Sequence, residues 1–304
     1  SFILMQDNER VSIVIVNLNG ERYLKECIPS ILATDYPREK IEVILVDNGS
    51  TDNSTGVVRR LMPKAVIIEN HENNYAKANN TAVKIAKSDL IAFLNNDTVV
   101  HKNWLRPLVK RINSSDDIAG VGSRIFFPDG RMQSAGLIDK GDFYWEDNPL
   151  QGVEAEQDRP VTAISGASAL YKRACLEDAG LLDEDFNMYY EDVDLGLRIT
   201  KQGLRILYVP ESTIVHTFNG SIREPALNFF LERNRLYTVA KHWPEQLCKA
   251  LASSRLTSSA EGHLLLQRMV KQLREKLDRH YPPERSDILK LALDREIERI
   301  INGA

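Results

Sequence analysis

Short apolar runs followed by polar residues alternate with helical patterns through the first third of the chain. The apolar runs cover residues 11–16, 41–46, 65–68 and 90–94. Helical spacing follows the first run, where Leu24, Ile28, Ile31 and Leu32 share one face, and a further helix is expected near residues 76–86. Right-handed strand–helix–strand crossovers then give a parallel sheet. The run at 90–94 is apolar throughout, which predicts a central strand buried on both faces.

Polar side chains directly follow three of these strands. They are Asn17 and Asn19, on either side of Leu18, in the segment Asn17–Gly20, Asp47 after the second run, and Asn95, Asn96 and Asp97 after the run at 90–94. Parallel strands bring their carboxyl ends to one edge of the sheet, where ligands of open α/β sheets bind. Asp97 suits a divalent cation that holds a diphosphate, and Asp47 suits hydrogen bonds from a nucleobase or ribose. The alternatives are a capped turn at Asp97 and an Asx turn at Asp47.

The phosphate-binding signals of other nucleotide folds are missing from this sequence. No G-x-G-x-x-G follows the first strand, which weakens a dinucleotide interpretation, and the absence of G-x-x-x-x-G-K-S/T excludes a P-loop. The helix that opens near residue 76 offers free N–H groups, and Lys77 or amides such as Asn79 could reach a phosphate there. A solvated first turn is the alternative for each of these residues.

The middle of the chain combines an irregular region with small and aromatic residues. After a predicted helix at 103–111, residues 126–136 centre on a Pro-Asp-Gly turn. Trp145 and its aromatic neighbours could stack on a sugar, although a satellite core is slightly favoured. Residues 146–160 predict a mobile loop. Residues 161–170 are strand-like, and small residues such as Gly166 and Ala167 allow close approach of backbone or ligand.

Two later segments carry candidate chemistry. The helix predicted within 186–198 has Glu191, Asp192 and Asp194 in its first turn, where the helix dipole favours acids and keeps a carboxylate ionised. One of these carboxylates could act as a general base toward an attacking hydroxyl. The strand at 208–216 ends on His216, which could be a second ligand of the cation or an ordinary surface or core histidine.

Composition narrows the class of protein. The 304 residues are 43% hydrophobic and 27% charged, as in an ordinary globular protein with a sizeable core. A formal net charge of −4 argues against a nucleic-acid partner. The scattered Cys27, Cys175 and Cys248 fit reduced cytosolic thiols. No stretch approaches the ~20 apolar residues of a spanning helix, and Phe2–Met5 is too short for the core of a signal peptide. Because the chain begins with Ser1, it could be a trimmed piece or a fragment of a longer protein.

Beyond Pro244 the pattern becomes helical. Leu265, Met269, Leu273 and Leu277 repeat at helix spacing, as do Ile288, Leu291, Ile297 and Ile300, with Pro282-Pro283 between the two groups. Packing on the preceding domain or at a homodimer contact is the favoured interpretation. Docking on a membrane surface is the alternative, because the basic residues Arg268, Lys271, Arg274 and Lys276 lie nearby.

In this order, the segments resemble the family 2 glycosyltransferases, which have the GT-A fold. The matching text is VSIVIVNLNG, EVILVDNGSTDNS, LIAFLNND, PDGRMQSAG, ISGASALYKR, MYYEDVDLGLR and VPESTIVH. The resemblance implies an α/β fold: a Rossmann-like, mostly parallel central sheet flanked by helices, with a C-terminal helical extension. It implies a catalytic domain at 1–243, with a nucleotide-binding half at about 10–100 and an acceptor-binding half at about 101–243, followed by the extension at 244–304. The branch most similar to this chain is that of bacterial rhamnosyltransferases acting on surface polysaccharides.

The resemblance also implies a role for each matched position. Asp47, helped by Asn17, Leu18 and Asn19, would meet the nucleobase and ribose, and Asp97 with His216 would hold Mn²⁺ or Mg²⁺ on the donor diphosphate. Asn95 replaces the first acid of the family's D-x-D, Leu18 replaces a common aromatic, and Asn74 replaces a usual glycine. Asp192 would be the base, with Glu191 in reserve. The remaining expected contacts are Lys77, Asn79 and Asn96 with the nucleotide, and Gly166, Ala167 and Trp145 with the acceptor.

The expected reaction is an inverting, metal-assisted transfer from a nucleoside-diphosphate sugar to a hydroxyl of a glycan or lipid-linked acceptor. The similarity to the rhamnosyltransferase branch suggests dTDP-rhamnose, and UDP-hexoses stay open. The expected location is the cytoplasm, with peripheral contact at the inner face of the membrane as an option. The rival interpretations are a nucleotidyltransferase, which would want a Gly-rich basic loop after the first strand, and a non-catalytic carbohydrate-binding module.

Overall fold

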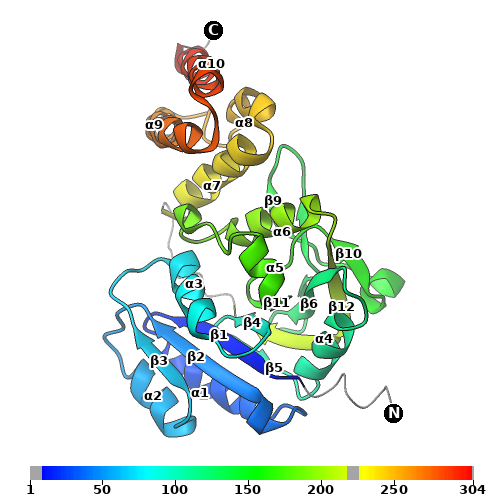
Figure 1. Ribbon diagram of the computed structural model, residues 1–304. Helices are drawn as coiled ribbons and strands as arrows, with labels where there is room; N and C mark the ends of the chain where they lie inside the picture. Colours follow the sequence, from blue (N-terminus) through cyan, green and yellow to red (C-terminus); the bar gives the residue numbers. More distant parts are fainter. Residues whose placement is uncertain (1–8, 218–225, 303–304) are drawn as a thin grey trace. The chain divides into compact units, whose positions relative to one another are not determined.

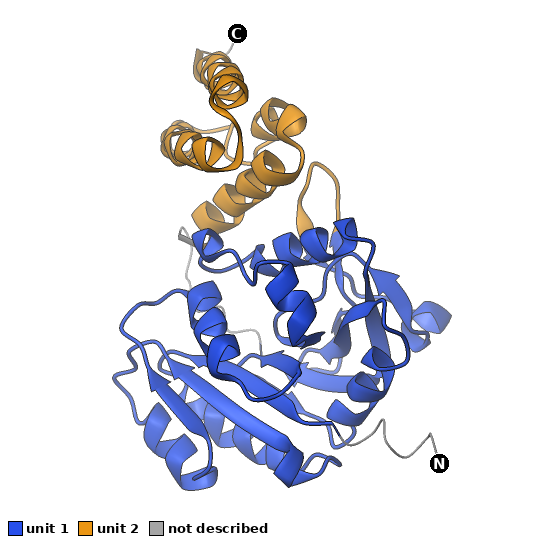
Figure 2. Ribbon diagram, viewed as in Figure 1, with its two compact units in different colours: residues 1–138, 146–219 blue, residues 139–145, 220–304 orange. Residues whose placement is uncertain are grey.

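The computed structural model describes residues 9–217 and 226–302. The chain divides into two compact units, which are described separately below (Figure 2). Unit 1 contains residues 1–138 and 146–219, and unit 2 contains residues 139–145 and 220–304. The second unit therefore takes a short piece from the middle of the sequence. The predicted functional boundary at residue 243 stays a prediction.

Four parallel strands form the first half of unit 1. They are β1 (Val11–Asn17), β2 (Ile41–Asp47), β3 (Val66–Glu69) and β4 (Leu90–Leu94), and they lie side by side in the order β4-β1-β2-β3. All five residues of β4 are buried, which confirms the predicted central strand. In the register of β1 and β2, Asn17 lies opposite Asp47. The predicted gathering of polar residues at the carboxyl edge is therefore confirmed for these two strands.

Helices cover both faces of these strands (Figure 1). On one face, α1 (Glu21–Leu32) and α2 (Ser54–Leu61) bury apolar residues such as Leu24, Ile28 and Val57 in one core with Ile13 and Leu45. On the other face, α3 (Tyr75–Ile85) contributes a row of alanines to a second core. Side chains alternate along a strand, so each strand supplies both cores in turn.

The sheet continues with strands of mixed direction. The order beyond β4 is β11 (Ser168–Lys172), β6 (Ile118–Phe126), β12 (Arg205–His216) and β10 (Arg159–Val161), with β11 antiparallel to both neighbours. The end of β12 also pairs with β5 (Thr98–Val100), and β6 also pairs with β7 (Met132–Ser134). The helices of this half are α4 (Leu105–Ile112), α5 (Arg173–Asp178) and α6 (Glu191–Lys201). Among the described residues, the sheet is thus parallel from β3 to β4 and mixed beyond β4.

Two predictions for the middle of the chain were wrong in part. Of the strand-like run at 161–170, only Val161 and residues from Ser168 onward are in strands, because the small residues between them make a turn in which the Ser168 N–H donates to the Ser165 carbonyl at 3.2 Å. The segment 146–160 contains β9 (Trp145–Asp147), a 3-10 turn at Gly152–Glu156 and most of β10. The Tyr208 hydroxyl holds this segment through the Ala155 carbonyl at 2.8 Å.

Unit 2 is built from helices, as the apolar spacing predicted. They are α7 (Ala226–His242), α8 (Leu247–Ala252), α9 (Ala260–His280) and α10 (Pro283–Asn302), so Pro282-Pro283 does separate the last two. Met269, Leu273 and Leu277 are buried as expected. Ile288 and Leu291 are instead 69% and 52% exposed. The buried face of α10 carries Leu293 and Ile297, which are four residues apart and therefore lie on the same side of the helix. Ile288 and Leu291 lie on other sides.

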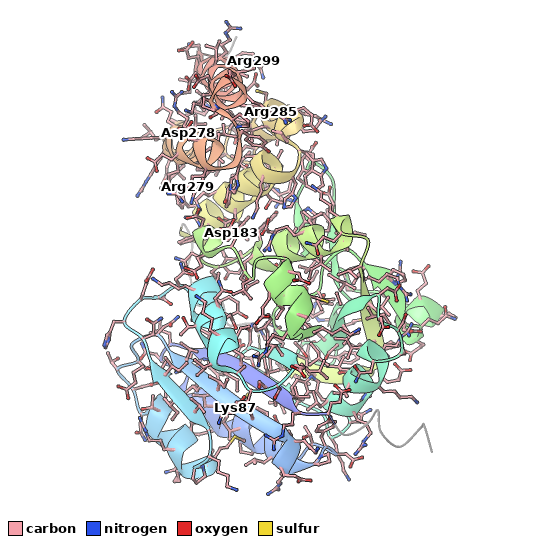
Figure 3. The ribbon with its side chains drawn as sticks, viewed as in Figure 1. Lys87, Asp183, Asp278, Arg279, Arg285 and Arg299 are labelled. Atoms are coloured by element: carbon pink, nitrogen blue, oxygen red, sulfur yellow. The ribbon has the colours of Figure 1, made fainter. Side chains whose placement is uncertain are left out.

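Charged side chains on these helices largely pair within the unit. Asp278 of α9 accepts from Lys290, and Arg299 donates to Glu296 at 2.6 Å (Figure 3). Arg285 lies over the Tyr281 ring at 5.0 Å. No helix of the described residues is long and apolar enough to cross a membrane.

The segment 139–145, between β8 (Leu137–Asp139) and β9, is fixed inside unit 2 by a clamp around Tyr144. The Tyr144 hydroxyl donates to Glu232 at 3.0 Å, and the guanidinium groups of Arg235 and Arg255 lie 4.2 and 4.0 Å from its ring centroid. Arg235 is fully buried and donates to the Asp142 carbonyl at 2.7 Å and to the Ala250 carbonyl at 2.6 Å. The buried guanidinium of Arg235 and the two backbone carbonyl oxygens thereby have hydrogen-bond partners away from water, as buried ionic groups require.

Candidate functional site

The loops after β1, β2 and β4 are joined by hydrogen bonds centred on the buried Asn17. Its Nδ2 donates to Asp47 Oδ1 at 2.7 Å and to Ser50 Oγ at 3.0 Å, and its Oδ1 accepts from Asn96 Nδ2 at 2.7 Å. A Cβ at Gly20 would lie 2.2 Å from Asn17 Oδ1 and 2.3 Å from Asn96 Nδ2. The predicted edge is therefore a packed polar cluster, and Gly20 leaves room for it.

Asp47 closes the loop after β2 with its side chain, through a backbone contact three residues on, where the Asx turn of its alternative interpretation would use the residue two on. Its Oδ1 accepts from Ser50 Oγ at 2.6 Å, and its Oδ2 accepts from the Ser50 N–H at 2.9 Å. A carboxylate oxygen accepts more than one hydrogen bond, so the turn leaves acceptor capacity for a nucleoside. Leu18 is 36% exposed beside it, and Asn19 adopts a positive φ of 51° while its Oδ1 accepts from the Thr51 N–H at 2.7 Å. The nucleoside contacts stay predictions.

The two helix residues predicted to reach a phosphate have local partners. Lys77 pairs with Glu72 at 2.5 Å on an exposed surface. Asn79 is buried, and its Nδ2 donates to the Tyr75 carbonyl one turn earlier at 3.0 Å. Their role toward the nucleotide stays a prediction.

Asp97 and His216 come together, as the sequence suggested. His216 ends β12, and the antiparallel pairing of β12 with β5 sets it opposite Thr98, the residue after Asp97. His216 Nε2 lies 3.1 Å from Asp97 Oδ1, and both side chains are at least nine-tenths buried. A ring nitrogen and a carboxylate oxygen are donors that suit Mn²⁺, so these two side chains could supply part of a ligand set. Among the described residues, no group of three His, Cys, Asp or Glu side chains forms a complete site.

A hydrogen-bond chain that the sequence reasoning missed continues from this pair. His216 Nδ1 lies 3.1 Å from Gln133 Oε1, and Gln133 Nε2 donates to Asp147 Oδ2 at 3.0 Å. Gln133 is buried on β7, and Asp147 ends β9. The signal was the segment PDGRMQSAG, which was recognised in the sequence without a role for its glutamine.

Asp192 lies at the start of α6 and is held by two backbone N–H groups. Its Oδ2 accepts from Gly166 at 3.3 Å, and its Oδ1 accepts from Val193 at 2.8 Å. Burial raises the pKa of Asp192 to about 6, an effect that these N–H groups oppose and the Asp147 carboxylate adds to. The helix terminus was expected to keep the carboxylate ionised, but desolvation outweighs it, and Asp192 is ionised only above about pH 6.

Glu191 has a more apolar environment than Asp192. Its side chain is 5% exposed, and within the described chain its Oε2 has no hydrogen-bond partner. Burial first and then the neighbouring Asp192 charge raise the pKa of Glu191 well above its ordinary value. Of the two acids, Asp192 is therefore the one that ionises more readily.

Tyr75, also missed in the sequence, links the acids to the β4 loop. Its hydroxyl donates to Asn95 Oδ1 at 3.0 Å. Burial and the carboxylates of Glu191, Asp192 and Asp97 all raise its pKa, so these carboxylates act on one shared region. A small cavity lies beside Glu191 and Asp192. Its lining residues are Tyr75, Phe93, Ile164, Gly166, Ala169, Tyr171, Leu182, Glu191, Asp192 and Leu195.

The predicted acceptor residues divide between the two units. Gly166 is beside Asp192, as described, and the Ala167 carbonyl accepts from the Asn95 N–H at 3.2 Å, which ties β11 to the β4 loop. Trp145 belongs to unit 2. The acceptor role of all three stays a prediction.

The sequence and fold match known proteins. The model of glycosyl transferase family 2 matches residues 12–180. The O-antigen biosynthesis protein RfbC of Myxococcus xanthus is 32% identical over 232 residues, which are 72% of this chain and 18% of RfbC. The N-acetylglucosaminyl-diphospho-decaprenol L-rhamnosyltransferase of Mycobacterium tuberculosis is 26% identical over 254 residues, 74% of this chain and 82% of that enzyme.

Among solved structures, GalNAc-T7 with UDP, GalNAc and Mn²⁺ superposes with a TM-score of 0.67 at 20% identity, covering 88% of this chain and 55% of the other. This likeness confirms the GT-A fold. The chain spans less than a fifth of the length of RfbC. Because the family model matches more than half of the chain, the protein belongs to glycosyl transferase family 2.

Proposed function

We propose that this chain transfers a sugar from a nucleoside-diphosphate donor to an acceptor hydroxyl with inversion at the anomeric carbon. The observation that supports the proposal is that Asp97, which lies 3.1 Å from His216, and Asp192 both act on Tyr75 and raise its pKa. The similarity of the chain to RfbC and to the L-rhamnosyltransferase supports a dTDP-rhamnose donor and a glycan or lipid-linked acceptor in surface-polysaccharide synthesis. A UDP-hexose donor is the alternative.

Asp192 is the proposed general base. It accepts the proton of the acceptor hydroxyl as that oxygen attacks C1 of the donor sugar, and the bond from C1 to the diphosphate oxygen breaks on the opposite face. The N–H groups of Gly166 and Val193 fix its two oxygens, and a pKa of about 6 keeps it ionised at neutral pH yet basic enough to take the proton. A single displacement of this kind needs one base and no second catalytic carboxylate.

Asp97 and His216 would hold Mn²⁺ or Mg²⁺. The bound cation would supply electrostatic stabilisation for the charge on the departing nucleoside diphosphate. The chain's own contribution is orientation: the pairing of β5 with β12 holds both side chains, and burial keeps water from competing for them. Asn17, Asp47 and Asn96 would bind the nucleoside at the adjoining edge.

The test is hydrolysis or transfer by purified protein against a panel of nucleotide sugars, with Mn²⁺ and with a chelator. We expect release of one nucleoside diphosphate that stops with chelator and returns with Mn²⁺. The variant Asp192→Asn should bind that donor normally and lose transfer, whereas Asp178→Asn, at the exposed end of α5 in the same unit, should transfer at the wild-type rate. Sugar binding that needs neither metal nor nucleotide would favour a carbohydrate-binding module and contradict the proposal.

The proposed acceptor would decide where the protein works. A lipid-linked acceptor would bring it to the inner face of the cell membrane from the cytoplasm. Peripheral contact there, and a homodimer, stay open. Flotation with vesicles and sedimentation of the purified chain would test these two expectations.

A further inference from the structure

We propose that Tyr75 and Asn95 are positioning residues for the base Asp192. Their side chains form a strut that holds the turn at residues 165–168, and the backbone of that turn supports the carboxylate. The inference rests on the proposed function for its purpose, which is proton transfer to Asp192. All of these residues belong to unit 1.

The strut is built on two contacts of one hydroxyl group. The Tyr75 hydroxyl donates to Asn95 Oδ1 at 3.0 Å, and the Gly166 carbonyl oxygen lies 3.4 Å from the same hydroxyl. A Cβ at Gly166 would lie 3.1 Å from the Tyr75 hydroxyl oxygen, so the tyrosine packs directly on the backbone there. The Asn95 N–H also donates to the Ala167 carbonyl at 3.2 Å. Asn95 is therefore tied to the turn through its backbone and, by way of Tyr75, through its side chain.

Gly166 passes this support to the base. Its N–H donates to Asp192 Oδ2 at 3.3 Å while its carbonyl oxygen faces Tyr75, so one residue connects the strut to the carboxylate. A bond of 3.3 Å is longer than most N–H···O bonds, and a small shift of the turn would break it. Such a shift matters for catalysis, because a misplacement of about 1 Å can cost about 100-fold in rate.

The neutral amide of Asn95 fits this task. Asn95 stands where the D-x-D pattern has its first acid, and its side-chain oxygen accepts from Tyr75 without adding a charge. Three carboxylates already act on Tyr75, those of Glu191, Asp192 and Asp97. An aspartate at position 95 would add a fourth negative charge to this region, which would oppose the ionisation of the base.

The pKa of Asp192 reports on the positioning. The Gly166 N–H lowers this pKa, because a hydrogen bond to a carboxylate favours its ionised form. Tyr75 is neutral near pH 6, since burial raises its pKa, so Tyr75→Phe removes no charge from the site. The other titratable groups that act on Asp192 or respond to its charge stay the same in that variant; they are Glu191 beside it on α6, Asp147 on β9 and Tyr171 on β11. A higher pKa of Asp192 in Tyr75→Phe therefore indicates a lost N–H contact.

The first test measures the pKa of Asp192 by ¹³C NMR titration of the aspartate-labelled full chain, with Asp192→Asn identifying its signal. We expect a midpoint of about 6 in the wild type. Tyr75→Phe should raise the midpoint by about 1 pH unit, as the loss of one N–H bond to a charged group predicts. Asn95→Ala breaks the strut at its other end and should raise the midpoint as well, even if Tyr75→Phe fails to fold. The double variant should shift no further than either single variant, because both remove the same strut.

The matched control is Tyr36→Phe. The Tyr36 hydroxyl also donates to a backbone carbonyl of unit 1, that of Glu9 at 2.5 Å, so its loss costs a comparable hydrogen bond elsewhere. This variant should keep the wild-type midpoint of Asp192. A folded Tyr75→Phe or Asn95→Ala in which Asp192 titrates as in the wild type would overturn the inference.

The second test uses transfer. Tyr75→Phe should lower kcat by about 10- to 100-fold and leave the KM for the donor close to its wild-type value, because the strut supports the base and not the donor. The acid limb of its pH profile should move to higher pH together with the pKa of Asp192. Tyr36→Phe should transfer at the wild-type rate with an unchanged profile.

The two proposals fail separately. If Asp192→Asn transfers at the wild-type rate, the proposed base is wrong, and the NMR titration still decides whether the strut supports the carboxylate. If Asp192→Asn loses transfer while folded Tyr75→Phe keeps the wild-type kcat and pH profile, the base stands and the positioning role is wrong.

Discussion

The pKa of Asp192 predicts that its conversion to asparagine stabilises the protein while abolishing transfer. Wild-type protein must keep a buried carboxylate ionised above about pH 6, and an amide of the same shape avoids that cost. The fold stays the same, because the asparagine oxygen can still accept from Gly166 or Val193. The proposed base is thus a residue whose charge serves the reaction at the expense of stability.

The magnitude follows from the pKa in the two states. A rise from 3.8 in the unfolded chain to about 6 in the fold corresponds to about 3 kcal/mol of lost stability when Asp192 is fully ionised. Asparagine keeps one of the two accepted N–H bonds, and losing the other costs about 1 kcal/mol. The net gain for Asp192→Asn is therefore about 2 kcal/mol at about pH 8. Because the folded pKa is the higher one, the wild-type penalty is complete above about pH 6 and disappears as pH falls toward 3.8.

Urea unfolding of wild type and Asp192→Asn, followed by circular dichroism, measures this difference. We expect the variant to be more stable at about pH 8 and the advantage to vanish by about pH 4, because the cost of the ionised Asp192 in the wild type disappears as pH falls toward 3.8. Transfer by wild type should fall as pH drops below about 6, and the variant should be inactive throughout. A variant that is less stable at about pH 8, or an advantage that does not change with pH, would refute the reasoning.

Three further substitutions test other parts of the site. Glu191→Gln should change the free energy of unfolding at neutral pH by less than about 1 kcal/mol and leave transfer intact, because burial and the neighbouring Asp192 charge raise the pKa of this carboxyl and so favour its neutral form, which glutamine resembles; loss of transfer would instead make Glu191 the base. Asn17→Ala strands the partners of a buried amide, Asp47 among them, so we expect about 1–3 kcal/mol of destabilisation in urea unfolding and a higher KM for the donor, and an unchanged KM would argue against the nucleoside site. Gly196→Ala sets a Cβ 2.3 Å from the Thr162 carbonyl oxygen and should destabilise the fold by about 1–3 kcal/mol in thermal unfolding. A variant as stable as the wild type would contradict this close approach of α6 to Thr162.

Most of the fold could be predicted because its central elements have strong local patterns. The run of Leu90–Leu94 predicted β4 at its observed bounds, and Pro282-Pro283 separated α9 from α10. Where the pattern was weak, tertiary pairing decided the outcome. Residues 165–168 make a turn between strands although their side chains are as small as those of their neighbours. Ile288 lies on the exposed side of α10 because Leu293 and Ile297 pack instead.

The residues of the candidate site could likewise be predicted only in part from the sequence. Asp97 and Asp192 could be found because a polar residue after a buried strand, and an acid at a helix start, are visible in the sequence, and the family resemblance located His216. Gln133 and Tyr75 could not be found, since they act through long-range contacts, among them those with His216 and Asn95, that no local pattern encodes. The pKa of Asp192 also needed coordinates, because burial and not its place in the helix sets the direction.

The clamp around Tyr144 has a consequence for how the chain can be divided. Residues 139–145 depend on Glu232, Arg235 and Arg255, which lie far later in the sequence. A ribosome therefore finishes the α8 region before this segment can reach its final contacts. Any protein engineered by cutting or swapping the C-terminal helices alone would leave a tyrosine and a buried guanidinium without their partners. The exchangeable module is the helices together with this distant heptapeptide.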